Sequence, residues 1–254
     1  MVHHMLRLLE LLAQYRRPAG NLICLLGQTS SHTNIWMDLS DNPHMIVSGT
    51  TGSGKSILLH NIIANVLDAN KSIIELVDPK NIEFYEYEKL SHRDINVCYS
   101  YDDALSLLNR LIVTMEKRYE LMRSGRKGFP PVLLIIDELA DLIIQDGRDK
   151  LFFKGLCKLA QKCRAANMSI ILSTQRPAVS VISGAIKANF PARIACRVTN
   201  KTDSRVILDC GGAEKLIGKG DALLKDSYRQ LERFQIAYTD AAEVCKRYGP
   251  IASS

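Results

Sequence analysis

A glycine-rich segment near residue 50 combines the residue types that bind a phosphate chain. Residues 49–56 read GTTGSGKS and match the pattern G-x-x-x-x-G-K-[ST] at every defined position. Glycines let the backbone curl so that its N–H groups face phosphates, and a following helix adds the positive end of its dipole. We therefore expect ATP to bind here, with Lys55 reaching the β- and γ-phosphates and the Ser56 hydroxyl coordinating Mg²⁺. The expected nucleotide-binding residues are Gly49, Thr50, Thr51, Gly52, Ser53, Gly54, Lys55 and Ser56.

Two carboxylates directly follow the most apolar stretch of the chain, residues 132–136 (VLLII). A strand that ends in Asp137-Glu138 places both side chains at the carboxyl edge of a sheet, where open α/β sheets bind their ligands. We expect Asp137 to help hold magnesium through water and Glu138 to activate the attacking water. The alternative is that the acidic pair only begins a helix, because acidic residues favour helix N-termini.

A third polar group ends another apolar stretch, where residues 173–177 read STQRP. Gln175 is placed to hydrogen-bond both the γ-phosphate and the lytic water, which would pass the state of the nucleotide to the residues that follow. The alternative is an ordinary polar end of a strand.

These groups require a scaffold, and the hydrophobic pattern predicts one. Short apolar strands alternate with helices, which is typical of a mostly parallel central sheet flanked by crossover helices, an α/β fold. Strands are expected at 44–48, 72–77, 95–99, 132–136 and 169–173, with further candidates at 193–198, 222–224 and 233–238. Helices are expected after Ser56, around Phe84 and Tyr87, and at 101–123 and 150–166.

The remaining sequence indicates one globular unit with a short N-terminal extension. Residues 1–20 contain a leucine-rich amphipathic helix, and residues 21–254 form the main α/β domain. Arg7 and Glu10 interrupt the leucines, which argues against a signal peptide. Apolar runs are far shorter than the roughly 20 residues that cross a bilayer. The net charge of +6 permits a polyanionic partner without requiring one. Seven cysteines form no C-x-x-C pair, so the sequence favours reduced thiols in the cytoplasm over a disulfide framework or zinc site.

Several longer strings resemble the FtsK/SpoIIIE DNA translocases, within the FtsK–HerA group of motor ATPases. They occur in the family's order over residues 25–224 and include PHMIVSGTTGSGKS, LVDPK, MEKRYELM, LLIIDELADL, LAQKCRAAN, LSTQRP, VISGAIKANFPARIA, KTDSRVILD and GAEKLIGKGDALL. KTDSRVILD is not shared with generic phosphate-loop enzymes. The resemblance implies a RecA-like P-loop NTPase domain that assembles as a homohexameric ring and threads double-stranded DNA through its pore, using ATP and Mg²⁺.

The resemblance also implies residues that act between subunits. Arg164 (in AQKCRAA) and Lys201 (in KTDSR) would reach a neighbour's ATP and stabilise charge on the transferring phosphate, and Arg118 (in MEKRY) is a further candidate. The alternative for each is a surface charge.

Residues that would contact DNA follow from the same comparison. Arg176 and Lys187 match the family's pore loop, and Ser183 and Gly184 lie at its expected tip, where a main chain can approach phosphates. The segment 146–150 would be a second pore loop, but its length departs from the family, which weakens the case for its Arg148 and Lys150.

The family's membrane-spanning N-terminal region and winged-helix module are not recognised in this sequence. We expect a minimal motor of the kind carried by a phage or mobile element, which would work in the host cytoplasm, or a piece of a longer chain. Two other functions stay open. The chain could move protein, although such relatives normally carry several motor domains, or it could be an assembly factor that only binds ATP, although a binding-only site needs no Glu138.

Overall fold

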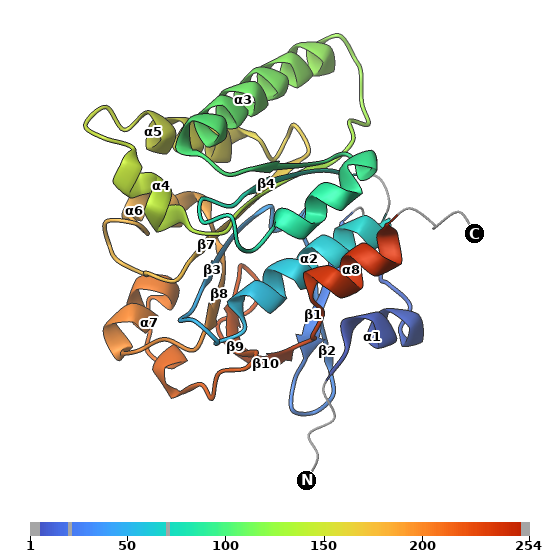
Figure 1. Cartoon of the computed structure of the whole chain (residues 1–254), viewed down its shortest axis with the longest axis vertical. Helices are drawn as coiled ribbons and strands as arrows, with labels where there is room; N and C mark the ends of the chain where they lie inside the picture. Colours follow the sequence, from blue (N-terminus) through green and yellow to red (C-terminus); the bar gives the residue numbers. More distant parts are fainter. Residues whose placement is uncertain (1–5, 20–21, 70–71, 250–254) are drawn as a thin grey trace.

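The computed structural model describes residues 6–19, 22–69 and 72–249, and in these residues ten strands form a single sheet (Figure 1). Across the sheet the order is β2-β1-β10-β9-β8-β3-β7-β6-β4-β5. The strands are β1 (Ile23–Gln28), β2 (Asn34–Asp38), β3 (His44–Ser48), β4 (Ile73–Val77), β5 (Ile95–Cys98), β6 (Val132–Ile136), β7 (Met168–Thr174), β8 (Ala192–Cys196), β9 (Asp221–Lys225) and β10 (Glu232–Ile236).

The six strands from β8 to β5 are parallel, and the other four add an antiparallel edge. β3 lies between β7 and β8, with Ser48 opposite Thr174 and Ala195. β6 pairs with both β7 and β4. The carboxyl ends of β3, β6 and β7 therefore lie side by side at one edge of the sheet. The mostly parallel α/β architecture predicted from the sequence is confirmed.

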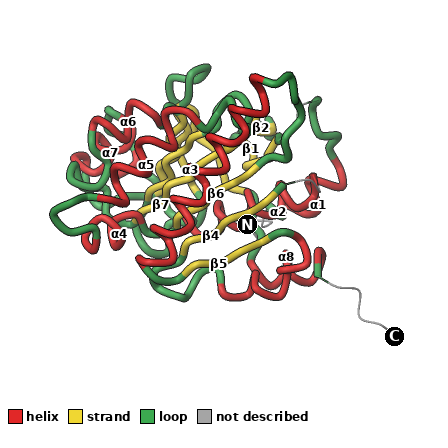
Figure 2. Tube along the Cα trace, turned by 90° about the horizontal axis from the view of Figure 1, so that it is seen from above, coloured by secondary structure: helices red, strands yellow, loops and turns green. Residues whose placement is uncertain are grey.

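Helices cover both faces of this sheet (Figure 2). Side chains of the central strands alternate between the faces: Met45 and Val47 pack in one apolar cluster, while Ile46 between them packs in the other. The helices of the first face are α1 (Leu8–Gln14), α2 (Lys55–Ala69), the 3₁₀ helix η1 (Tyr85–Arg93) and α8 (Ala241–Tyr248). Those of the second face are α3 (Tyr101–Arg123), α4 (Leu139–Gln145), α5 (Leu151–Lys162), α6 (Gly184–Asn189) and α7 (Lys201–Leu208). A short 3₁₀ turn, η2 (Ala213–Lys215), follows α7.

The N-terminal helix is shorter than predicted and belongs to the same core. Leu8 and Leu11 are buried, and the backbone N–H of Leu8 donates to the carbonyl of Tyr238 at 2.8 Å. Arg7 pairs with Glu243 of α8. Part of the predicted segment, residues 1–5 and 20, lies outside the described residues. In the described part of the chain, no helix combines the length and apolar character needed to cross a membrane.

His44, the first residue of β3, gives the fold a specific response to acid. It is 4% exposed, with its ring against Phe190 and its Nε2 3.7 Å from the Cys163 sulfur. Burial is the main cause that lowers the pKa of His44 from its ordinary 6.5 to about 4. The unfolded chain therefore binds this proton first as the pH falls, so the stability that the neutral imidazole contributes is complete above pH 6.5 and declines toward pH 4.

Between pH 7 and pH 5 we expect the free energy of unfolding to fall in both the wild type and His44→Gln. The wild type should lose about 2 kcal/mol more, because only its unfolded state gains a proton at position 44. Urea unfolding at both pH values measures the difference, and all other titrating groups cancel in the comparison. Identical losses in the two proteins would show that His44 is not the responsible group.

Candidate functional site

The glycine-rich segment forms a curled loop between β3 and α2. Gly52 and Gly54 have φ values of +73° and +109°, a region that side chains rarely adopt. A Cβ on Gly54 would also lie 2.5 Å from the backbone nitrogen of Gly220. That nitrogen donates to the carbonyl of Ser53 at 2.8 Å, so the loop that contains Gly220 supports the curled backbone. Glycine at position 54 is therefore required by both conformation and space.

Lys55, the first residue of α2, lies against the acidic end of β6. Its ammonium donates to Asp137 Oδ1 at 2.5 Å, to the Asp137 carbonyl at 3.2 Å and to Ser173 Oγ at 2.9 Å. Lys55 and Asp137 are each 3% exposed. A buried ion pair of this kind persists when hydrogen bonds satisfy its remaining donors and acceptors. The ends of β6 and β7 therefore meet at this one ammonium group.

Glu138 is fully buried beside this pair and is oriented by the end of β7. Its Oε1 accepts from the Thr174 hydroxyl at 2.5 Å, and its Oε2 accepts from the backbone N–H of Gln175 at 3.1 Å. Lys80, after β4, approaches the same oxygen at 3.4 Å. Glu138 also directly precedes α4, so the acidic pair does stand at a helix start, although its side chain caps no helix N–H.

Gln175 connects this carboxylate to the phosphate loop. Its backbone N–H binds Glu138, while its side-chain Oε1 accepts from the Thr51 hydroxyl at 3.0 Å. The sequence analysis predicts a role for Gln175 but none for Thr174 or Lys80, whose contacts with Glu138 arise because their strands are neighbours of β6. Lys80 lies three residues after a strand and within the family string LVDPK, and these were the signals available for it.

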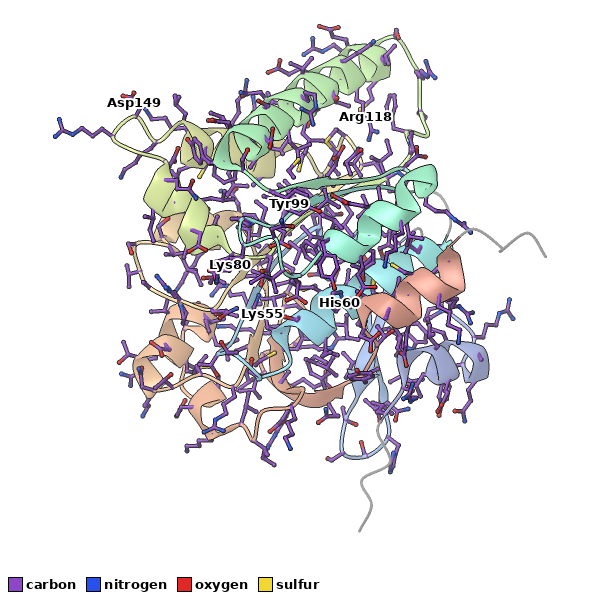
Figure 3. All side chains as sticks on the ribbon, viewed as in Figure 1. Lys55, His60, Lys80, Tyr99, Arg118 and Asp149 are labelled. Atoms are coloured by element: carbon purple, nitrogen blue, oxygen red, sulfur yellow. The ribbon has the colours of Figure 1, made fainter. Side chains whose placement is uncertain are left out.

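Ser56 lies one residue beyond Lys55 and donates its hydroxyl to Glu83 Oε2 at 2.7 Å. Glu83 in turn pairs with His60 Nε2 at 2.8 Å. Burial raises the pKa of Glu83, but the hydrogen bond and charge of His60 outweigh it and hold the pKa below its usual range. Lys55, His60 and Lys80 lie in the same part of the molecule, whereas Asp149 lies at the tip of a projecting loop (Figure 3).

The oxygen donors here fit a magnesium ion that is shared with phosphates. Among the described residues, no group of three or more His, Cys, Asp or Glu side chains is arranged to hold a metal. Magnesium in nucleotide sites is bound by one or two protein oxygens, with phosphates and waters completing the octahedron. The hydroxyl of Ser56, which follows Lys55, and the carboxylate of Asp137, which is bonded to Lys55, are oxygen donors of the required chemistry.

A family model matches part of this chain, and a solved structure matches most of it. The model described as the FtsK/SpoIIIE family matches residues 7–127. The conjugation coupling protein TcpA of pCW3, solved as a monomer with ATPγS, is 31% identical with a TM-score of 0.80, and the match covers 91% of this chain and 71% of TcpA. The chain belongs to the FtsK/SpoIIIE family. The RecA-like P-loop NTPase fold that the resemblance implies is confirmed by the match to TcpA.

Other relatives extend the comparison. The DNA translocase FtsK of Leptospira interrogans is 37% identical over 91% of this chain, and the DNA translocase SpoIIIE of Bacillus subtilis is 37% identical over 82%. This chain spans only 27% and 29% of these two proteins, respectively. The type VII secretion ATPase EccC of Thermomonospora curvata has a TM-score of 0.75 at 21% identity, covering 93% of this chain and 32% of that chain, and so shares the fold.

Two of the cations expected to act between FtsK/SpoIIIE subunits are exposed, and one of them, Arg164, lies far from this chain's own phosphate loop. Arg164 is exposed and precedes β7, whereas the phosphate loop follows the carboxyl end of the neighbouring β3. The seven residues of β7 separate these two edges of the sheet by about 20 Å. Lys201 is exposed at the start of α7, where its side chain lies against Gly211.

Arg118, the third such candidate, is placed differently. It is 6% exposed, its guanidinium donates to the carbonyl of Ala166 at 2.6 Å, and it stacks over the ring of Phe129 at 5.4 Å. Burial also lowers the pKa of Arg118. A guanidinium engaged in this way connects α3 to the segment before β7, and it could reach a neighbouring subunit only by breaking these contacts.

The residues expected to contact DNA lie on the segment after β7. Arg176 and Gly184 are exposed, and Ser183 caps α6 by accepting from the N–H of Ile186. Lys187 is half-buried, and its ammonium lies 2.8 Å from Asp209, which also pairs with Arg193. The structure therefore leaves Arg176 open to a partner but joins Lys187 to a carboxylate.

Proposed function

We propose that this chain is an ATP-hydrolysing motor that moves double-stranded DNA as a ring-shaped homohexamer in the cytoplasm. The observation that carries the proposal is the convergence of Lys55, Asp137, Glu138 and Gln175 at one sheet edge, directly before the exposed Arg176. The names of the FtsK and SpoIIIE relatives support DNA as the substrate, and the ATPγS complex of TcpA supports ATP as the nucleotide.

ATP binding begins with the curled backbone of residues 49–56 and the positive end of α2. Lys55 uses all three of its N–H donors within the protein, so it must exchange at least one of them for a phosphate oxygen. Ser56 and Asp137 would hold magnesium, which when bound neutralises charge on the phosphates.

Hydrolysis requires a base, and Glu138 is the carboxylate placed for it. Thr174 and the N–H of Gln175 fix both of its oxygens, which orients the carboxylate but also occupies it. We infer that Glu138 exchanges one of these bonds for the attacking water. The same exchange would move the end of β7, and with it the segment that begins at Arg176.

Cations from the next subunit complete the site. Arg164 and Lys201 are both exposed, and Arg164 lies at the opposite edge of the sheet from its own phosphate loop. Their positive charge would stabilise the transferring phosphoryl group.

DNA would be held through its phosphates by Arg176, Ser183, Gly184 and Lys187, without base readout. For this, Lys187 must exchange Asp209 for a phosphate oxygen, since its ammonium is already paired. Asp209 would keep Arg193 as a partner after the exchange.

The test of this function is ATP hydrolysis with and without linear duplex DNA. We expect duplex to stimulate the wild type, and Arg176→Ala/Lys187→Ala to lose that stimulation while binding ATP normally, because two phosphate contacts are removed. The salt slope of DNA binding should also fall by about 2 in the double variant. Arg126→Ala/Lys127→Ala removes the same charge from an exposed loop after α3 and serves as the control.

Stimulation that persists in the Arg176→Ala/Lys187→Ala variant would place the DNA contacts elsewhere. Hydrolysis that never responds to duplex would favour a protein-moving ATPase. ATP binding without any hydrolysis would favour an assembly factor.

A further inference from the structure

A chain of hydrogen bonds runs from the half-buried Ser56, the predicted magnesium ligand, into the core. The Ser56 hydroxyl donates to Glu83 Oε2 at 2.7 Å, Glu83 Oε1 lies 2.8 Å from His60 Nε2, and His60 Nδ1 lies 2.9 Å from the Tyr87 hydroxyl. His60 is 6% exposed and Tyr87 is fully buried. The function proposed above makes use of Ser56 but gives no role to the three residues behind it.

The backbone that carries Glu83 is rigidly held. Asp78, which directly follows β4, accepts through Oδ2 from the N–H groups of Ile82, Glu83 and Phe84, at 2.9, 2.7 and 3.0 Å. Its Oδ1 accepts from the N–H of Lys80 at 3.2 Å. One carboxylate therefore shapes the whole turn between β4 and η1. The position of Glu83 next to Ser56 is built into the fold.

A serine hydroxyl that coordinates a cation must direct its lone pairs at the metal and its proton elsewhere. Glu83 accepts that proton, so it leaves the lone pairs of Ser56 Oγ free for a metal. Residues that orient a ligand in this way influence metal affinity nearly as much as the ligand does. The carboxylate also adds a negative charge one hydrogen bond away from the cation.

His60 gives Glu83 a fixed orientation. Its two ring nitrogens contact Glu83 on one side and Tyr87 on the other, and its ring packs edge-on against Phe84. His60 lies one turn after Ser56 on α2, so a single helix presents both the metal ligand and the group that positions the ligand's partner.

We propose that Glu83 is a positioning residue of the magnesium site, which orients the Ser56 hydroxyl and strengthens cation binding, and that His60 holds Glu83 in place. The inference rests on the proposed ATPase function, because it assigns a role within the same site. It makes a separate prediction about metal affinity, which is measured without turnover.

The experiment measures binding of a fluorescent ATP analogue by the full chain, with saturating Mg²⁺ and with EDTA, and Mn²⁺ affinity by electron paramagnetic resonance. We expect Glu83→Ala to weaken Mn²⁺ binding by about 10-fold to 100-fold, the range found for residues that support metal ligands. Affinity for the analogue in EDTA should stay within about 2-fold of wild type, because the phosphate loop is unchanged. The matched control is Glu86→Ala, which removes a nearby carboxylate that pairs with Lys89 and not with Ser56.

Three further variants separate positioning from folding. Glu83→Gln keeps an oxygen acceptor for Ser56 but loses the charge, so Mn²⁺ affinity between those of wild type and Glu83→Ala is expected. His60→Leu should weaken Mn²⁺ binding, and His60→Gln should restore it, because the glutamine amide replaces the donor to Glu83. Circular dichroism verifies the fold of each variant, and Glu83→Gln carries the test if Glu83→Ala does not fold.

Wild-type Mn²⁺ affinity in both Glu83 variants would overturn the inference and leave the proposed function intact. A wild-type chain that binds no ATP analogue with or without Mg²⁺ would instead contradict the proposed function itself.

Discussion

Glu138→Gln should bind ATP with an affinity close to wild type and hydrolyse it at least about 100-fold more slowly, the usual contribution of a general base. The amide keeps the shape of the side chain and can still accept from Thr174, but it cannot take a proton from water. Binding should survive because Lys55 and the curled loop supply the phosphate contacts. Single-turnover hydrolysis and equilibrium binding of the same preparation measure both quantities.

The matched control for this variant is Asp141→Asn. Asp141 lies in the first turn of α4, 3.7 Å from Lys80, and it shares that lysine with Glu138 without contacting Thr174. We expect hydrolysis within a few-fold of wild type. Equal rates in wild type and Glu138→Gln would show that Glu138 is not the base. The contacts of Lys80 and Thr174 with Glu138 would then have no part in hydrolysis.

Arg164→Ala should lower ATP hydrolysis by about 1,000-fold or more, as expected for an arginine that stabilises phosphoryl transfer from a neighbouring subunit. The decisive form of the experiment mixes Arg164→Ala chains with Lys55→Ala chains, each inactive alone. An interface that combines Lys55 of the first with Arg164 of the second has an intact site. Partial recovery of hydrolysis on mixing is therefore expected, with a dependence on the ratio of the two chains.

The control for the mixing experiment is Lys162→Ala, which removes an exposed cation two residues before Arg164. This variant should hydrolyse ATP at the wild-type rate. Mixtures of Arg164→Ala and Lys55→Ala that stay as inactive as their components would contradict action across the interface. The separation of about 20 Å between Arg164 and its own phosphate loop would then need another explanation.

Elements with a strong hydrophobic pattern could be predicted from the sequence. The strand at 132–136 and the helix at 101–123 agree with β6 and α3, because both have long apolar runs or helical spacing. The six- to eight-residue helices α6, α7 and α8 were not predicted. Such short helices depend on caps and tertiary packing, and the available signal was the cap itself, as where Asn200 accepts from the N–H of Asp203.

Some contacts of the candidate site could likewise be predicted from the sequence, and others could not. The rule that parallel strands end at one edge predicts that Lys55 and Asp137 lie close together, and they do. No spacing in the sequence brings Glu83 to Ser56, or Thr174 to Glu138, because those contacts depend on how the turn after β4 folds and on which strands are neighbours. The burial of Arg118 could not be predicted either, because the charged residues of MEKRY suggest an exposed segment.

ATP-dependent displacement of a third DNA strand from a linear duplex tests whether this chain moves along DNA, because only movement along the duplex removes the third strand. We expect the wild-type chain to displace the third strand only with ATP and Mg²⁺ and whatever the duplex sequence, and we expect Glu138→Gln not to displace it. A chain that hydrolyses ATP but leaves the third strand bound under every condition would contradict it.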